Sequence, residues 1–237
     1  MERLDKLIAN SGTLSRKEVH RLIKSGAVSV NGITTKDRGF CIDPESAVIK
    51  INGEVISLDK YVYIMLNKPE GVVSATKDPA EKTVVDLVPE EFKKKNLFPA
   101  GRLDRNTTGF VLITDNGDFA HKILSPKNHI EKTYEARLAE PVSADKLDEV
   151  AKGITLGDGT ECLPAKVRVL EDTQNPLVEI KICEGKYHQI KRMFAAVGNA
   201  VIELKRVKMG NLSLDENLKL GECRLLTKEE VELIKSK

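Results

Sequence analysis

One carboxylate in this sequence is set apart by the residues on either side of it. Asp104 lies between Arg102 and Arg105 in the segment PAGRLDRNTTGFVLITDNGD, which spans residues 99–118. A carboxylate is already ionised at neutral pH, so it needs no activating base to act as a nucleophile or as a base. Neighbouring cations favour the charged form. The segment therefore predicts an anionic group held by positive charge just before a buried strand at residues 110–113.

The same aspartate also has an ordinary structural explanation. An acid in a turn often caps backbone N–H groups or forms a surface ion pair with a neighbouring arginine. Thr107, Thr108 and Gly109 suit a loop whose backbone must come close to a ligand. The spacing alone leaves both interpretations open, and the structural one is the more common for a single aspartate.

Two further segments carry side chains that could act together with Asp104. In EGKYHQIKRMFAAVGNAV, the residues His188, Lys191 and Arg192 lie at i, i+3 and i+4, so a helix would place them roughly on one face. Such a face could hold a carboxylate charged or meet a phosphate, or it could simply be solvated. Tyr134, in EKTYEARL, could stack on a nucleobase or pack half-buried in a strand.

The elements that would position these residues follow an irregular order from residue 61 onward. The patterns YVYIMLNKP, FVLIT, KTYEARL and PLVEIKIC predict strands, and DFAHKILS, SADKLDEVAKG, YHQIKRMFAAVG and TKEEVELIKSK predict helices. This order does not repeat a strand–helix unit. It favours an α+β fold with a mixed, mainly antiparallel sheet over a doubly wound fold.

The N-terminal part has a different pattern and predicts a small separate module. Apolar residues at 4, 7 and 8 predict a short helix, and a second helix is expected to begin at the N-cap Ser15, with Glu18 completing a capping box and Gly26 ending it. A hairpin is expected around residues 52–53. We place the domain boundary near residues 58–61, which gives domains 1–58 and 59–237.

Net charge is only +2, but the positive charge is unevenly distributed. Residues 1–30 carry six Lys/Arg against three acids, and residues 186–208 carry six against one. Such local basic faces suggest a polyanion bound at defined places, although a solvated face is the commoner outcome for any single patch. In the first module the candidate RNA-contacting cations are Arg3, Arg16, Lys17, Arg21 and Lys24.

Composition excludes several classes of protein. The chain of 237 residues is 41% hydrophobic and 31% charged, as expected for an ordinary folded protein. We expect no membrane association, because no apolar run approaches the length of a bilayer span and the N-terminus lacks the apolar core of a signal peptide. The four scattered cysteines and four histidines show no metal-ligand spacing, so we expect no metal, no disulfide framework and a cytoplasmic location.

The order of these motifs resembles a known family. The segment RLDKLIANSG…SRKEVHRLIKSGAVSVNG is similar to the S4 domain, a small RNA-binding module, over roughly residues 2–50. The segments GRLDRNTTGFVLITDNGD, EKTYEARL, EGKYHQIKRMFAAVGNAVIEL and LKRVKMGNLSL occur in the order seen in pseudouridine synthases of the RsuA type, which modify ribosomal RNA. This resemblance covers essentially the entire chain and implies an S4-like module followed by a pseudouridine-synthase-like catalytic domain.

The resemblance implies a role for individual residues. Asp104 matches the catalytic aspartate, Tyr134 the active-site tyrosine that packs on the target base, and Lys191 the basic residue that pairs with the aspartate. Arg102 matches an arginine that helps displace the flipped nucleotide, and Leu204 an apolar residue lining the pocket. Asn106 stands where the family often has an acid. His188, Arg192 and Arg206, within the matching basic segments, are the remaining candidate RNA contacts of the catalytic domain.

The implied reaction is isomerisation of a uridine in ribosomal RNA, most closely in the branch acting on small-subunit 16S rRNA. The family needs no cofactor, and we expect a monomer whose partner is rRNA or an assembling subunit. Three alternatives remain: a large-subunit 23S rRNA enzyme of the same family, a non-catalytic RNA-binding assembly factor, and a carboxylate-dependent glycosidase. The last normally needs a second acid facing the first, and none stands out near Asp104.

Overall fold

The chain forms two compact units. The structure, a computed structural model, describes residues 1–11, 14–44, 46–56, 61–93 and 96–235. The first unit comprises Met1–Val62, and the second comprises Tyr63–Lys93 with Leu97–Lys237. The domain boundary predicted between residues 58 and 61 falls mostly on residues 57–60, which lie outside the described residues.

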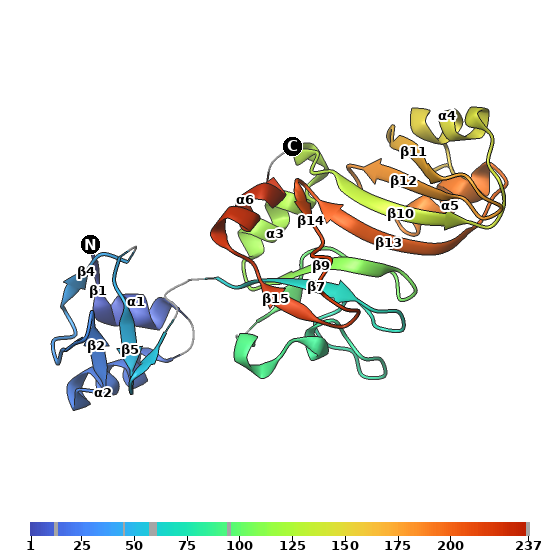
Figure 1. Ribbon diagram of the computed structural model, residues 1–237. Helices are drawn as coiled ribbons and strands as arrows, with labels where there is room; N and C mark the ends of the chain where they lie inside the picture. Colours follow the sequence, from blue (N-terminus) through green and yellow to red (C-terminus); the bar gives the residue numbers. More distant parts are fainter. Residues whose placement is uncertain (12–13, 45, 57–60, 94–95, 236–237) are drawn as a thin grey trace. The chain divides into compact units, whose positions relative to one another are not determined.

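The first unit combines two helices with short strands (Figure 1). In chain order its elements are β1 (Glu2–Arg3), α1 (Leu4–Asn10), α2 (Arg16–Ser25), β2 (Val28–Val30), β3 (Ile33–Thr34), β4 (Cys41–Ile42), β5 (Ile49–Ile51) and β6 (Glu54–Val55). Strands β3-β2-β5-β6 form one antiparallel sheet, and β1 pairs with β4. Apolar side chains from α1, α2 and the sheet form its core, which includes Leu4, Ile8, Val19 and Ile23.

The local predictions for this unit are confirmed. Helix α2 has Ser15 as N-cap with the capping box in place: Glu18 N–H donates to Ser15 Oγ at 3.4 Å, and Ser15 N–H donates to Glu18 Oε2 at 2.8 Å. Gly26 ends the helix in the left-handed conformation. The turn between β5 and β6 is made by Asn52 and Gly53, both with positive φ, as a type I′ hairpin requires.

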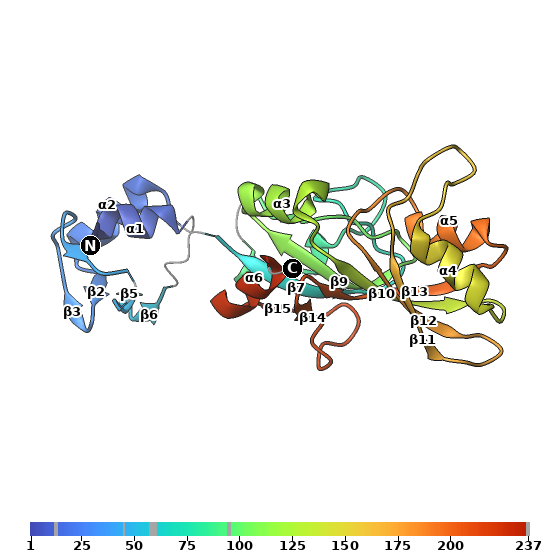
Figure 2. The same ribbon diagram turned by 90° about the horizontal axis from the view of Figure 1, so that it is seen from above.

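The second unit is built on one large sheet flanked by helices (Figures 1 and 2). Its strands are β7 (Tyr63–Lys68), β8 (Phe98–Pro99), β9 (Thr108–Thr114), β10 (Lys132–Leu138), β11 (Lys166–Glu171), β12 (Leu177–Ile182), β13 (Val201–Met209), β14 (Leu212–Ser213) and β15 (Cys223–Leu225). Its α-helices are α3 (Gly117–Leu124), α4 (Ala144–Lys152), α5 (Gln189–Ala196) and α6 (Lys228–Lys235), with short 3₁₀ turns at Val85–Leu87, Glu90–Phe92 and Pro126–Asn128.

The strand order is β11-β12-β10-β13-β9-β7-β15, with β14 on β13 and β8 on β9. Its pairings are antiparallel except for the central one, in which β13 runs parallel to β9. This confirms the predicted α+β class with a mixed, mainly antiparallel sheet. The one parallel pairing joins segments almost a hundred residues apart, and it brings the end of the Asp104 loop beside β13.

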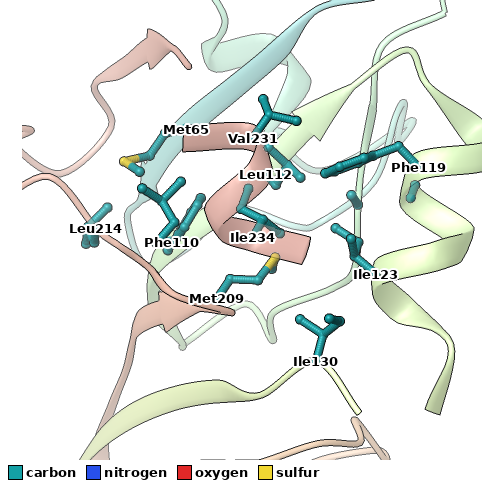
Figure 3. Packing of buried hydrophobic residues seen from close by; sticks show 13 residues of the cluster. Met65, Phe110, Leu112, Phe119, Ile123, Ile130, Met209, Leu214, Val231 and Ile234 are labelled. Atoms are coloured by element: carbon teal, nitrogen blue, oxygen red, sulfur yellow. The ribbon is translucent and has the colours of Figure 1, made fainter. Parts of the chain in front are cut away.

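The core under α3 and α6 supports the strand that follows the Asp104 loop. Figure 3 shows side chains from both helices gathered around Phe110 and Leu112 of β9; Phe119 and Ile123 come from α3, and Ile234 from α6. All of these side chains are buried. Val111 and Ile113 alternate to the other face of β9 and are also fully buried. A strand buried on both faces is a rigid base for the loop that precedes it.

Candidate active site

Asp104 lies in the loop between β8 and β9, at the edge of a pocket in the second unit. The empty space in this pocket is ≈ 420 Å³, part of it open to solvent. Asp104 and Arg102 come from the loop, Tyr134 from β10 and Leu204 from β13. The remaining lining residues are Leu103, Thr107, Ile182, Gly185, Lys186, His188, Gln189 and Ile190. The structure therefore brings the predicted carboxylate, aromatic ring and apolar wall together from segments far apart in the sequence.

The pocket continues into a wider groove that shares several of its walls. This groove has ≈ 1380 Å³ of empty space, again partly open to solvent. Arg102, Asp104 and His188 line both cavities, together with Leu103, Gly185 and Lys186. The groove adds the segment around Ser74 and Asp78 on one side and Tyr187 on the other. A polymer could lie in the groove while one of its units enters the pocket.

The loop that carries Asp104 is held by a buried lysine. Lys68, at the end of β7, is fully buried, and its Nζ donates to the backbone carbonyls of Pro69, Arg105 and Thr107 at 3.0, 3.1 and 2.9 Å. These three acceptors use all three ammonium hydrogens. Burial is the main cause that lowers the pKa of Lys68, to about 8, and Lys191 lowers it slightly, whereas Asp104 and Glu70 raise it. The ammonium form therefore still predominates at pH 7.

The segment after β7 holds the loop by its backbone as well. The Ser74 hydroxyl donates to Leu103 O and accepts from Leu103 N–H, both at 2.9 Å. Gly71 N–H donates to Arg105 O at 3.0 Å. Within the loop, Thr107 N–H donates to Asp104 O at 3.0 Å. The backbone on both sides of Asp104 is thus fixed, while its carboxylate is 29% exposed and faces the pocket.

We expected Lys191 to pair with Asp104, but the basic residue that contacts Asp104 is His188. His188 Nε2 lies 3.5 Å from Asp104 Oδ1, a contact that becomes an ion pair when the imidazole is protonated. Lys191, the expected partner of the carboxylate, donates from Nζ to Asn106 Oδ1 at 2.6 Å. An asparagine in place of the acid common in the family therefore gives Lys191 a neutral acceptor within the same loop.

The side chain of Tyr134 is held in position by contacts with Arg206. The tyrosine is 7% exposed, and its hydroxyl accepts from Arg206 Nη1 at a long 3.5 Å. The guanidinium carbon lies 6.0 Å from the ring centroid, and Arg206 Nε donates to Phe110 O at 2.7 Å. Arg206 itself is only 3% exposed. Burial is incompatible with the predicted contact to RNA backbone, so we revise its role to holding Tyr134 and β9.

Of six other predicted RNA contacts, two are found in ion pairs and four are exposed. Arg192 pairs with Asp158 at 2.6 Å, and Arg3 pairs with Asp5 at 2.8 Å. The four cations of α2 are exposed, as predicted: Arg16, Lys17, Arg21 and Lys24. The ion pairs weaken the case for Arg192 and Arg3 as RNA ligands, because a phosphate would have to compete with a carboxylate.

The helix prediction around His188 was wrong at its first turn. Helix α5 begins at Gln189, and His188 precedes it with φ 49° and ψ 32°, a left-handed conformation. His188 is therefore not on a helical face with Lys191 and Arg192. The packing side was predicted correctly, since Ile190, Phe194 and Val197 are buried. We attribute the error to the Gly-initiated turn, which a side-chain periodicity does not detect.

Gly109 also has a role that differs from the expectation. Its φ is +97°, and a Cβ at this position would lie 2.2 Å from Arg206 O and 2.9 Å from Arg206 N. The close approach that the structure shows at Gly109 is made to the backbone of β13. Gly109 is what allows β9 to pair in parallel with β13 next to the active-site loop.

Sequence reasoning missed three residues of the site: Lys68, Ser74 and Tyr187. Lys68 was interpreted only as the end of a strand. Its burial has no local signal, because a lysine at the end of a strand is usually exposed and its loop acceptors Arg105 and Thr107 are remote in sequence. Ser74 likewise has no local signal, since its partner Leu103 is remote in sequence.

A sheet-based fold with a carboxylate and a tyrosine in one pocket, preceded by a small basic helical module, is the architecture of RNA-modifying enzymes of one class. A family model described as RNA pseudouridylate synthase matches residues 62–196, and a model of the S4 domain matches residues 2–48. The chain belongs to the RNA pseudouridylate synthase family and carries an S4 domain at its N-terminal end.

Similar proteins cover the full length of the chain. The uncharacterized RNA pseudouridine synthase YtzG of Bacillus subtilis is 46% identical over 98% of both chains. Ribosomal small subunit pseudouridine synthase A of Vibrio cholerae is 44% identical over 97% of both chains. A crystal structure described as a pseudouridylate synthase has a TM-score of 0.68 and 41% identity, and the match covers 99% of this chain and 100% of that one.

Proposed function

We propose that this chain isomerises a specific uridine to pseudouridine in small-subunit ribosomal RNA, with Asp104 as the essential carboxylate. The observation that carries the proposal is the pocket in which Asp104, Tyr134 and Leu204 meet. The relatives named ribosomal small subunit pseudouridine synthase A support the choice of rRNA. Large-subunit rRNA is the competing substrate.

The chemistry matches what these side chains offer. Isomerisation breaks the bond between uracil N1 and ribose C1′ and joins C1′ to C5; C5 gives up its proton and N1 gains one. No net electron transfer occurs. Asp104 supplies an ionised group that can react with the nucleotide, and Lys68 and Ser74 keep the backbone around it in place. Tyr134 and Leu204 form walls against which a planar base can pack.

The target base must leave its stack to reach this pocket. Flipping a nucleotide out of folded RNA costs a few kcal/mol. Arg102 is exposed and lines both the pocket and the groove, so it is placed to occupy the space that the base leaves or to hold the neighbouring phosphate. The S4 domain supplies sequence-independent affinity through the exposed cations of α2. We propose that the chain acts as a cytoplasmic monomer; size-exclusion chromatography with light scattering tests the oligomeric state.

Tritium release tests the reaction and the residue together. Small-subunit rRNA carrying uridine labelled with tritium at C5 should release tritium to water with the wild-type protein. Asp104→Asn keeps the size of the side chain but removes the charge, and it should slow release more than about a thousandfold. Asp172→Asn, an exposed acid that lines neither cavity, is the matched control and should be unaffected.

The substrate is decided by the same assay with labelled large-subunit rRNA. Release from small-subunit rRNA alone supports the proposal, and release only from large-subunit rRNA contradicts the proposed target while leaving the chemistry intact. Full activity of Asp104→Asn would contradict the assignment of the catalytic residue.

A further inference from the structure

An exposed aromatic pair lies at the rim of the groove beside Asp104. Tyr187 is 75% exposed, an unusual state for a tyrosine in a chain with 4% aromatic residues. Its ring stacks on the His188 ring, with centroids 3.8 Å apart and planes 16° from parallel. Both residues line the groove. One face of the Tyr187 ring is therefore covered by His188, and the other is available to a planar ligand.

The backbone beneath this pair is fixed in position. His188 has a left-handed conformation, which is strained for a residue with a side chain and persists only where the surrounding contacts hold it. The turn is closed by Gln189: its N–H donates to Lys186 O, its Oε1 accepts from Lys186 N–H, and its Nε2 donates to Glu184 Oε1 at 2.6 Å. Arg192, anchored by Asp158, donates to Tyr187 O at 3.4 Å. A ring presented this way loses little conformational freedom when it binds.

The surroundings of the ring fit a nucleic acid strand. Arg102 lines the same groove and is exposed, so it can meet a phosphate. Arg105 also lines the groove, but it is paired with Glu81 at 3.4 Å. His188 contacts both Asp104 and Tyr187. Only the His188 side chain therefore separates the Tyr187 ring from the reacting carboxylate. Aromatic side chains next to basic groups are the usual platform for single-stranded RNA, because every base offers a flat π-face.

We propose that Tyr187 stacks on the base of a nucleotide that neighbours the flipped uridine in the RNA strand. This inference rests on the proposed function. When the target nucleotide leaves its stack, its neighbours lose a stacking partner, and the Tyr187–His188 pair replaces it. Tyr187 thereby favours the flipped state without touching the reacting atoms, as a binding residue outside the uridine pocket.

The test pairs a substitution in the protein with the loss of one base in the RNA. The substrate is the rRNA on which the wild type releases tritium, assembled by ligation from a synthetic segment with an abasic nucleotide at position −2, −1, +1 or +2 from the modified uridine. On unaltered RNA, Tyr187→Ala should raise KM about fivefold to a hundredfold, the range of a lost base–aromatic stack. Tyr187→Phe should stay within about twofold of the wild type, since it keeps the π-face.

The double change distinguishes stacking from a structural effect. At one of the four positions, removing the base should raise the KM of the wild-type protein as much as Tyr187→Ala raises it on unaltered RNA. At that position, the KM of Tyr187→Ala should show no further increase. Leu220→Ala, at an exposed residue that lines neither cavity, should show the full abasic penalty. As an independent readout, 2-aminopurine at the coupled position should be quenched by the wild type and by Tyr187→Phe, but not by Tyr187→Ala.

Additive effects at all four positions would overturn the inference, as would an unchanged KM of Tyr187→Ala. These failures differ from failure of the proposed function, which would show as no tritium release by the wild type on unaltered RNA.

Discussion

Lys68 illustrates how much a single buried charge can determine in this fold. Two of its three hydrogen bonds connect the end of β7 to the carbonyls of Arg105 and Thr107 in the loop that carries Asp104, and the third goes to Pro69 O. An apolar side chain of similar length cannot satisfy those carbonyls, and buried acceptors without partners are costly. Lys68 therefore couples the stability of the sheet to the geometry of the active-site loop.

Lys68→Met should lower both stability and activity. We expect the free energy of unfolding to fall by about 3 kcal/mol, because hydrogen bonds to a charged group are lost and buried carbonyls remain unpaired. Tritium release should slow because the Asp104 loop is no longer fixed. Urea unfolding followed by circular dichroism measures the first effect. Lys77→Met, an exposed lysine of the following segment, is the control; equal stabilities of the two variants would contradict the role of Lys68.

At the level of secondary structure, strands with an apolar run or a clear alternation could be predicted, and strands without either could not. β7, β9, β10 and β12 lie where apolar runs and alternation predicted them. β13 was not predicted as a strand, because its sequence VIELKRVKM mixes exposed charges with apolar residues that face the core of the sheet. Its burial pattern is set by β10 and β9 on either side, and neither neighbour is visible in the local sequence.

The junction of β9 with β13 depends on the absence of a side chain at Gly109. Gly109→Ala should destabilise the second unit by about 3 kcal/mol or more, the sum of left-handed strain of about 1–2 kcal/mol and of overpacking of about 1–3 kcal/mol. Thermal unfolding measures the loss. Gly159→Ala shares the positive φ but has open space around the new Cβ. Gly159→Ala should lower the free energy of unfolding only by the backbone strain, about 1–2 kcal/mol. Equal losses of stability in the two variants would show that the close approach of Gly109 to Arg206 has no effect on stability.

On the scale of the whole molecule, two units share the proposed binding of RNA in different ways. The second unit offers a groove with little net charge, because Asp78 and Asp104 line it together with its cations. Two of those cations are also paired with acids: Arg105 with Glu81, and Lys186 with Glu184. In the first unit, four cations of α2 are exposed. This division predicts that affinity and its salt dependence come largely from the S4 domain, whereas the chemistry comes from the catalytic domain.

Among the helices of the described residues, none combines the length and the apolar character that a membrane span requires.

Neutralising the basic face of α2 should separate binding from chemistry. The variant changes four exposed residues to glutamine: Arg16, Lys17, Arg21 and Lys24. Each lost phosphate contact should reduce the slope of log affinity against log salt by about 0.7–0.9. The single-turnover rate at saturating enzyme should remain within about threefold of the wild type, because the changed residues line neither cavity.

The control removes the same amount of charge from the second unit. It changes four exposed lysines that line neither cavity: Lys122, Lys127, Lys146 and Lys152. Filter binding at several salt concentrations compares the two variants. If the control loses as much affinity and slope as the α2 variant, the S4 domain has no special share in RNA binding.

The sequence by itself determined what depends on short-range order. The capping box at Ser15 and Glu18, the Asn52-Gly53 hairpin, the buried strands and the family motifs are all local, since each is set by residues within a few positions of one another. Asp104 and Tyr134 could therefore be named as candidates from their own segments, and Leu204 from the family resemblance, before their positions were known.

Only the tertiary structure decided which groups meet. In the folded chain, His188 contacts Asp104, and Lys191 donates a hydrogen bond to Asn106. Arg206 is buried and contacts Tyr134, and Lys68 donates to the backbone of the Asp104 loop. These contacts join β7, β9, β10, β13 and α5, so they depend on strand order and on a parallel crossover of nearly a hundred residues. The energy of an electrostatic or hydrogen-bonded contact depends on distances of a few ångström in the folded chain, and such distances are not encoded in the spacing of residues along it.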